Sequence, residues 1–155
     1  MKIYVMVDME GISGVCCSAQ LDRPKGGVSA GQQYMTWDVN ACVDGCFRGG
    51  ATEVVVQDAH DAHHNLIWDQ LDGRGLYVQG KQRGRRMPAL KGSDGLILLG
   101  YHAMAGVPEA VLEHTMSPAE WQNFWINGRL AGEIAVDAGI AGDQGIPVIM
   151  VSGDD

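Results

Sequence analysis

The sequence has 155 residues, enough for one ordinary domain with a hydrophobic core and too few for two. It has 11 lysines and arginines against 19 aspartates and glutamates, a formal net charge of −8, which argues against nucleic acid or an anionic membrane as the main partner. No stretch approaches the ~20 apolar residues of a membrane span, and acidic residues fall where a signal peptide needs its apolar core. The four cysteines form no C-x-x-C pair, so we expect a reduced protein of the cytoplasm.

The first part of the chain predicts a strand, a long helix and a second strand. Residues 2–8 (KIYVMVD) and 52–58 (TEVVVQD) have the apolar, β-branched composition of buried strands. Between them, residues 30–48 carry apolar side chains at the spacing of an amphipathic helix, which Ser29 can cap and Gly49-Gly50 can end. The apolar positions of this helix are Met35, Val39, Cys42, Val43, Cys46 and Phe47.

The rest of the chain continues the alternation of strands and helices. An Asn127-Gly128 pair between alternating apolar residues predicts a type I′ hairpin. Continuous apolar strands that alternate with helices predict an α/β domain over residues 1–155: three layers, with a mostly parallel sheet covered by helices on both faces, plus one hairpin. The further expected elements are a short strand at 75–80, a buried strand at 95–102, a helix at 132–143 and a last buried strand at 146–155.

One short basic run departs from the acidic balance of the chain. It surrounds Gly84, and we interpret it as a solvated loop, in preference to a binding patch for nucleic acid. The run consists of Lys81, Arg83, Arg85 and Arg86.

Polar side chains follow three of the predicted strands, at the point where each strand ends. Asp8 ends the first strand and Glu10 follows it, His60 lies two residues after the end of the second, and His102 ends the strand at 95–102. In open parallel sheets ligands bind just beyond the carboxyl ends of the strands. We therefore expect these four side chains to gather at one edge of the sheet.

Two carboxylates and two imidazoles suit zinc or another divalent first-row metal. Glu133, at the expected start of the helix at 132–143, is a fifth candidate ligand. Five candidates exceed the three protein ligands of a single catalytic metal, whereas two metals ~3.5–4 Å apart with one bridging carboxylate would use them all. We expect Asp8 to bridge and Glu10 to bind one ion.

Each of these residues also has a simpler interpretation. Glu10 could accept backbone N–H groups in its turn, and His102 taken alone is more often a core histidine than a ligand. His63 and His64 are rivals of His60, and the pair at positions 60 and 64 has zincin spacing but lacks the glutamate of H-E-x-x-H. We favour His60 because it lies nearest the strand end.

His114 has no strand-end position. A histidine close to a metal pair but outside it can transfer protons or act as a nucleophile. The alternative is a surface histidine next to Glu113.

Five motifs in chain order, VDMEGISG, VVVQDAH, LLGYHAMAG, EHTMS and WINGRLAGEI, resemble the zinc-dependent D-aminopeptidases of the M55 metallopeptidase family. The resemblance implies hydrolysis of N-terminal D-amino acids from short peptides such as D-Ala-D-Ala, by two zinc ions per chain. It implies His114 as the catalytic nucleophile. The implied zinc ligands are Asp8 as bridge, Glu10, His60, His102 and Glu133.

Family members continue well beyond the VIMVSGDD segment into a second portion, which helps to form a ring-shaped homo-oligomer and the access route for substrate. The resemblance therefore implies a homo-oligomer, but this chain ends before that portion, which puts its assembly in doubt. Fold and metal alone would also permit another metal hydrolase, an amidase or a phosphatase, or an inactive truncated remnant. A phosphatase should show a glycine-rich phosphate loop or convergent cations, and neither is evident.

Overall fold

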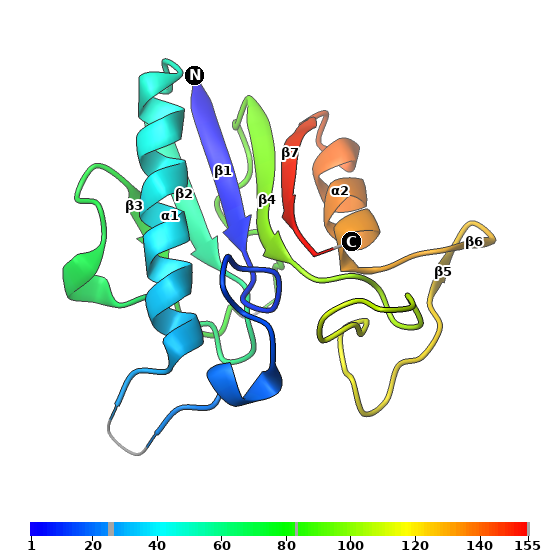
Figure 1. The fold of residues 1–155 in the computed structure, drawn as a ribbon. Coiled ribbons are helices and arrows are strands. Elements are labelled where there is room, and N and C mark those ends of the chain that lie inside the picture. Colours follow the sequence, from blue (N-terminus) through cyan, green and yellow to red (C-terminus); the bar gives the residue numbers. More distant parts are fainter. Residues whose placement is uncertain (25–26, 83, 155) are drawn as a thin grey trace.

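The computed structural model describes residues 1–24, 27–82 and 84–154. Its main sheet has the strand order β3-β2-β1-β4-β7, and every pair of neighbours is parallel (Figure 1). The predicted α/β class is confirmed. The strands of this sheet are β1 (Lys2–Val7), β2 (Glu53–Asp58), β3 (Leu76–Val78), β4 (Gly95–Tyr101) and β7 (Val148–Gly153). The remaining elements are helices α1 (Ala30–Arg48) and α2 (Glu133–Asp143), 3-10 helices η1 (Ser18–Gln20) and η2 (Trp68–Gln70), and the antiparallel hairpin of β5 (Trp125–Ile126) and β6 (Arg129–Leu130).

The two long helices cover opposite faces of the sheet. Side chains of β1 alternate between the faces, so that Val5 lies in the cluster with α1 and Met6 lies in the cluster with α2. Met35 and Val39 of α1 are fully buried against the first face, and Ala141 of α2 against the second. Both faces of the central strands are therefore apolar, which explains their continuous hydrophobic sequence.

Helix α1 has the predicted bounds because both of its ends are capped. The Ser29 hydroxyl accepts a hydrogen bond from the Gln32 amide at 3.1 Å, and the Gln32 side chain accepts one from the Ser29 amide at 3.0 Å. Such a capping box satisfies amide groups that the helix leaves free, and loss of the cap residue typically costs about 1 kcal/mol. Gly49 ends the helix, as expected.

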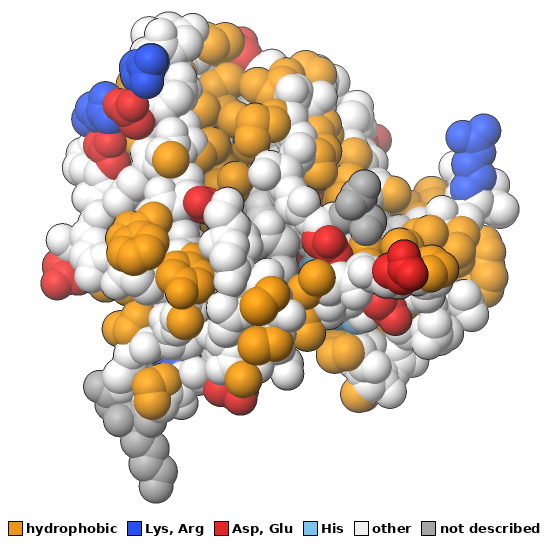
Figure 2. Space-filling view, in the orientation of Figure 1, with side chains coloured by type: hydrophobic (Ala, Val, Ile, Leu, Met, Phe, Trp, Pro, Cys, Tyr) orange, Lys and Arg blue, Asp and Glu red, His pale blue; other side chains and the backbone are white. Residues whose placement is uncertain are grey.

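Strand β7 departs from the prediction. It was expected to be buried, but Ile149 is 52% exposed, and Met150 and Val151 are also exposed. β7 is the last strand in the order, and among the described residues it pairs with β4 alone. Figure 2 shows hydrophobic side chains at the surface beside α1, over the β4 and β7 side of the sheet. The apolar sequence specified the strand correctly but not its place at the edge.

The hairpin forms at the predicted pair, because Asn127 and Gly128 both adopt positive φ angles of 51° and 77°. It projects away from the sheet (Figure 1), and its apolar side chains are exposed, with Trp125 at 58%.

The basic run is only partly a solvated loop. Lys81 and Arg85 are exposed, as expected, and Arg83 lies outside the described residues. The expectation is wrong for Arg86, which is half-buried and pairs with Asp137 and Glu133 of α2. The partners are distant in sequence, and spacing alone could not indicate them.

The strand order positions a site between β1 and β4. From β1 the chain passes through α1 on one face to β2, whereas from β4 it reaches β7 through α2 on the other face. Connections that leave neighbouring strands in opposite directions open a crevice beyond their carboxyl ends. The polar strand-end residues lie at this crevice.

Candidate metal centre

The turn after β1 is fixed against the end of β4, and this positions Glu10. The Gly11 amide donates a hydrogen bond to the Gly100 carbonyl at 2.9 Å. A Cβ atom at Gly11 would lie 2.0 Å from the Tyr101 carbonyl oxygen, so only glycine permits this approach. Glu10 is thereby held beside the crevice and is buried.

Asp8, Glu10 and His60 form one cluster, which we call the first ligand set. His60 Nδ1 lies 3.1 Å from Asp8 Oδ1 and 3.0 Å from Glu10 Oε2. One ligand atom from each residue lies within 4.8 Å of the other two. The set combines two carboxylates with one imidazole, drawn from the ends of β1 and β2 as the strand-end rule predicts.

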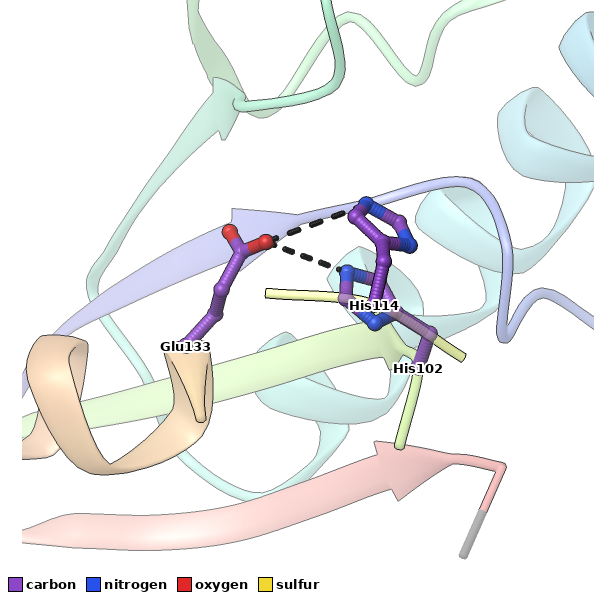
Figure 3. Close-up of side chains that lie close together, drawn as sticks. All are labelled: His102, His114 and Glu133. Atoms are coloured by element: carbon purple, nitrogen blue, oxygen red, sulfur yellow. Dashed lines mark ion pairs between the residues drawn. The ribbon is translucent and has the colours of Figure 1, made fainter. Parts of the chain in front are cut away.

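His102, His114 and Glu133 form a second cluster, the second ligand set (Figure 3). Glu133 Oε1 lies 3.2 Å from His102 Nε2 and 3.9 Å from His114 Nε2. The two imidazole rings are stacked, with centroids 3.7 Å apart and an interplanar angle of 13°. His102 directly follows β4, Glu133 lies in the first turn of α2, and His114 lies in the loop between β4 and β5.

Asp8 connects the two ligand sets. Its Oδ1 atom faces His60 of the first set at 3.1 Å, and its Oδ2 atom faces His102 Nε2 of the second set at 3.5 Å. The two oxygens of one carboxylate therefore face different sets, which is the arrangement a bridging ligand requires.

The charges of the first set are strongly interdependent. Burial would lower the pKa of His60, but hydrogen bonds and charge interactions with Asp8 and Glu10 raise it to about 10. Burial would likewise raise the pKa of Glu10, but His60 lowers it to about 2. The buried carboxylates thus hold a positive charge between them, which in the ion-free protein is the proton on His60.

In the second set, His102 has a nitrogen that fits a cation. Its Nδ1–H donates to the Ala103 carbonyl at 2.8 Å, which directs Nε2 toward Asp8 and Glu133. His102 Nε2 is buried and has no hydrogen-bond partner among the described residues. Burial would lower the pKa of His102, but Glu133 and Asp8 raise it to about 9. An imidazole nitrogen oriented by a backbone carbonyl and aimed at carboxylates is typical of a metal ligand.

His114 is held in a similar way. Its Nδ1–H donates to the Leu112 carbonyl at 2.9 Å, so in the neutral ring the lone pair is on Nε2, which faces Glu133. Leu112 adopts a positive φ of 53°, an uncommon backbone conformation for leucine. The alternative of a surface histidine is excluded, because the His114 side chain is only 14% exposed and its ring packs on His102.

The rivals of His60 are outside both ligand sets, although His63 lines the same cavity. His63 Nδ1 is 2.9 Å from the Asp58 carbonyl and His64 Nδ1 is 2.9 Å from the Ala62 carbonyl, and neither belongs to a ligand set. Sequence reasoning did not anticipate how Asp58, the residue at the end of β2, holds this loop. Its carboxylate accepts hydrogen bonds from Asn65 and Leu66, while the Asn65 amide donates to the His60 carbonyl at 2.7 Å.

A further group that the sequence did not reveal holds Glu133 in place. Arg86 Nη2 lies 3.2 Å from Glu133 Oε2 and donates to Asp137 Oδ2 at 2.9 Å, and the Tyr101 hydroxyl donates to the same Asp137 oxygen at 2.8 Å. Asp137 is fully buried. It lies four residues after Glu133, on the same face of α2, and this spacing is the one sequence signal that pointed to the group.

Both ligand sets border a cavity of about 550 Å³. Asp8, Glu10, His60, His114 and Glu133 all line it. The five predicted ligands and the predicted catalytic histidine are thus brought together around one crevice.

Comparison with known proteins identifies the family of this chain. The family model for peptidase M55, described as D-aminopeptidase, matches residues 1–155. This chain belongs to the M55 peptidase family. A D-aminopeptidase of Bacillus subtilis (strain 168) is 38% identical over 159 residues, which cover 100% of this M55 chain and 57% of the relative.

A solved structure shows the same fold at high similarity. It is the Zn-dependent D-aminopeptidase DppA from Bacillus subtilis, described as a self-compartmentalizing protease, with a TM-score of 0.92 and 37% sequence identity. The match covers 100% of this M55 chain and 57% of that one, so the chain spans little more than half the length of these relatives. Within the described ranges, no helix of the M55 chain is long and apolar enough to cross a membrane.

Proposed function

We propose that this chain carries the catalytic site of a dinuclear zinc aminopeptidase that hydrolyses N-terminal D-amino acids from short peptides such as D-Ala-D-Ala. The observation that supports it best is the position of Asp8, whose two carboxylate oxygens face two separate ligand sets. Membership of the M55 family, described as D-aminopeptidase, supports the choice of substrate.

Two sites would share the bridging carboxylate of Asp8. Glu10 and His60 complete one of them, and His102 and Glu133 complete the other. Each ion then has three protein ligands, the number at which a catalytic zinc keeps an open position. Bound zinc would polarise the scissile carbonyl and lower the pKa of water from 15.7 toward ~7.

We propose that His114 acts directly on the substrate, as the nucleophile. Its Nε2 lone pair would form a bond to the scissile carbonyl carbon, the peptide C–N bond would break, and the amine of the next residue would leave with a proton supplied by water. The hydroxide and water would then hydrolyse the resulting acyl-imidazolium, whose Nδ1 keeps its proton, and restore the neutral ring. The hydrogen bond from Nδ1–H to the Leu112 carbonyl keeps the lone pair on Nε2, where this step needs it.

The acidic cavity favours a substrate with a free amino terminus. Asp22 and Asp61 line the cavity together with the carboxylates of the ligand sets. A protonated amino group is attracted by these charges, whereas the neutral interior of a longer chain is not, so we infer an exopeptidase. Selection of D-residues would depend on the shape of the cavity around the first side chain.

We propose a homo-oligomeric, cytoplasmic protein. Strand β7 and the hairpin expose apolar side chains that a neighbouring subunit would cover, and DppA is described as self-compartmentalizing. All four cysteines are free, as in a reducing compartment.

Hydrolysis assays on the zinc-loaded chain test this proposal. We expect release of D-alanine from D-Ala-D-Ala, little turnover of L-Ala-L-Ala, and loss of activity when a chelator removes zinc. Turnover of p-nitrophenyl phosphate with none of D-Ala-D-Ala would favour a phosphatase instead. A folded chain that retains no zinc would indicate an inactive remnant.

A further inference from the structure

The two carboxylate oxygens of Glu133 have different surroundings. Oε1 accepts a hydrogen bond from the Met116 amide at 2.7 Å, and it lies 3.2 Å from His102 Nε2 (Figure 3). Oε2 accepts a hydrogen bond from Arg86 Nη2 at 3.2 Å. Oε1 therefore faces the histidines of the second ligand set, whereas Oε2 faces a cation.

Contacts with three other residues fix Arg86 beside Glu133. Its Nε and Nη2 groups donate to the two oxygens of Asp137, which is fully buried. The Tyr101 hydroxyl donates to the same carboxylate at 2.8 Å, and the Arg86 backbone carbonyl accepts a hydrogen bond from the Gln57 side chain at 2.7 Å. A planar guanidinium paired with a carboxylate at two atoms cannot turn away from Glu133 without breaking that pairing.

We propose that Arg86 restricts Glu133 to one zinc-binding oxygen, Oε1, and so keeps a coordination position open on the ion of the second ligand set. The inference rests on the proposed dinuclear site and adds which of its two ions substrate can reach. A carboxylate can bind an ion through one oxygen or through both. An oxygen that already accepts a hydrogen bond from a cation is the weaker ligand, because the cation engages its lone pairs.

The number of ligand atoms explains why the second oxygen of Glu133 matters. With Asp8 and His102, a single oxygen of Glu133 gives three protein ligands, the number at which a catalytic zinc keeps an open position. A second oxygen would be the fourth ligand atom and would complete the tetrahedron, as in a structural zinc site. The first ligand set lacks this restriction, because among the described residues no lysine or arginine pairs with Glu10. The open position therefore belongs to the second set, beside His114.

A crystal structure of the zinc-loaded protein tests the proposal directly. In the parent we expect Glu133 Oε1 at a bonding distance of about 2.0–2.2 Å from the ion of the second set, with Oε2 still on Arg86. Binding of that ion by both oxygens of Glu133 in the parent would overturn the proposal. The parent structure decides this point even if a variant does not fold.

The double variant Arg86→Met/Asp137→Asn frees Oε2 of Glu133. It removes one cation and one carboxylate together, so the local net charge is unchanged and no buried carboxylate is left unpaired. Both oxygens of Glu133 should then bind the ion, zinc content should stay at about two ions per chain, and turnover of D-Ala-D-Ala should fall by about 10–100-fold, the range typical of changes to groups that hold a metal ligand. Arg85→Gln is the matched control, because Arg85 is an exposed neighbour of Arg86, and it should keep the zinc coordination and the turnover of the parent.

Zinc content separates the proposal from a purely supporting role of Arg86. If Arg86 only holds Glu133 in place, its loss should weaken binding of the second-set ion, and the double variant should keep about one zinc ion per chain. That result would overturn the proposal, and so would a double variant with the turnover of the parent. A parent protein that binds fewer than two zinc ions would instead remove the proposed dinuclear site, and this inference with it.

Discussion

The two ligand sets differ in composition and in support. The first set has two carboxylates and one imidazole, and it lies at the ends of two adjacent strands, β1 and β2. The second has two imidazoles and one carboxylate, from β4, a loop and the start of α2. The Arg86–Asp137 ion pair supports the second set, whereas the loop contacts of Asp58 and Asn65 support the first.

This difference indicates that the two sets, which share Asp8, have different roles. The first set concentrates negative charge, which suits tight retention of a cation, and its one imidazole is His60. The second set contains an additional histidine, His114, whose Nε2 is free to act on a substrate. We therefore expect substitutions in the first set to alter metal content, and substitution of His114 in the second set to alter turnover alone.

The largest effect is expected from His114→Ala. Turnover of D-Ala-D-Ala should fall by about 10²–10⁴-fold, the contribution of a proton-transfer residue, or further if His114 is a nucleophile. Zinc content and the thermal unfolding midpoint should stay close to those of the parent. Rates, elemental analysis and trapping of an acyl-enzyme for mass spectrometry distinguish these roles.

His64→Ala is the control for His114→Ala, since His64 is an exposed histidine outside both sets. Loss of zinc in His114→Ala would make His114 a ligand of the second set, and parent-like turnover would deny it any catalytic role.

The next effect should appear in zinc content on substitution of His60. His60→Ala removes one of three ligands from the first set, so about one of two zinc ions per chain should be lost while the second set keeps its ion. His63→Ala and His64→Ala should retain both ions, because their rings face backbone carbonyls. Elemental analysis after dialysis measures all three. Zinc loss from His64→Ala with retention in His60→Ala would reassign the ligand.

A smaller effect is expected from pH on the affinity for zinc. In the ion-free protein the pKa values of His60 and His102 are raised to about 10 and about 9, so near pH 7 both rings carry protons that zinc must displace. Zinc affinity should rise about tenfold per pH unit for each ion whose binding releases one proton. Calorimetry of zinc binding in buffers of different ionisation enthalpy measures how many protons are released. Zinc binding at pH 7 without proton release would contradict the protonation of these two rings.

The stability of the ion-free protein should depend on pH in the opposite direction from zinc affinity, and fall as the pH rises. The folded-state pKa of His60 lies above its unfolded value of 6.5, so its protonation stabilises the fold fully below pH 6.5. That contribution is lost as the pH rises toward about 10. Thermal unfolding in excess chelator should therefore show a midpoint that falls over this range, and a midpoint that rises would contradict the assignment of the proton to His60.

The first set was accessible from sequence because its residues follow the ends of predicted strands. Asp8, Glu10 and His60 needed only the rule that parallel strands end at one edge, and His102 followed from the same rule. The sequence signal that predicted Glu133 as a ligand was weaker, because it was only the start of a predicted helix.

The contacts that complete the second set join segments that sequence patterns do not connect. His114 lies in a loop, and its resemblance to a family motif indicated its role more strongly than any spacing. Arg86 pairs with Asp137 across 51 positions, and the exposure of β7 depends on its place at the edge of the sheet. Periodicity reports which side chains are apolar, but it does not report which segments lie beside them.

The most direct test of the two-set arrangement is the zinc content of Asp8→Ala beside that of Glu10→Ala. Asp8 faces both sets, so its removal should lose both zinc ions, whereas Glu10→Ala should weaken the ion of the first set alone. Elemental analysis of the dialysed proteins should give about two ions per chain in the parent, none in Asp8→Ala and about one in Glu10→Ala. A single ion in the parent that persists in Asp8→Ala would contradict the shared carboxylate and the dinuclear site built on it.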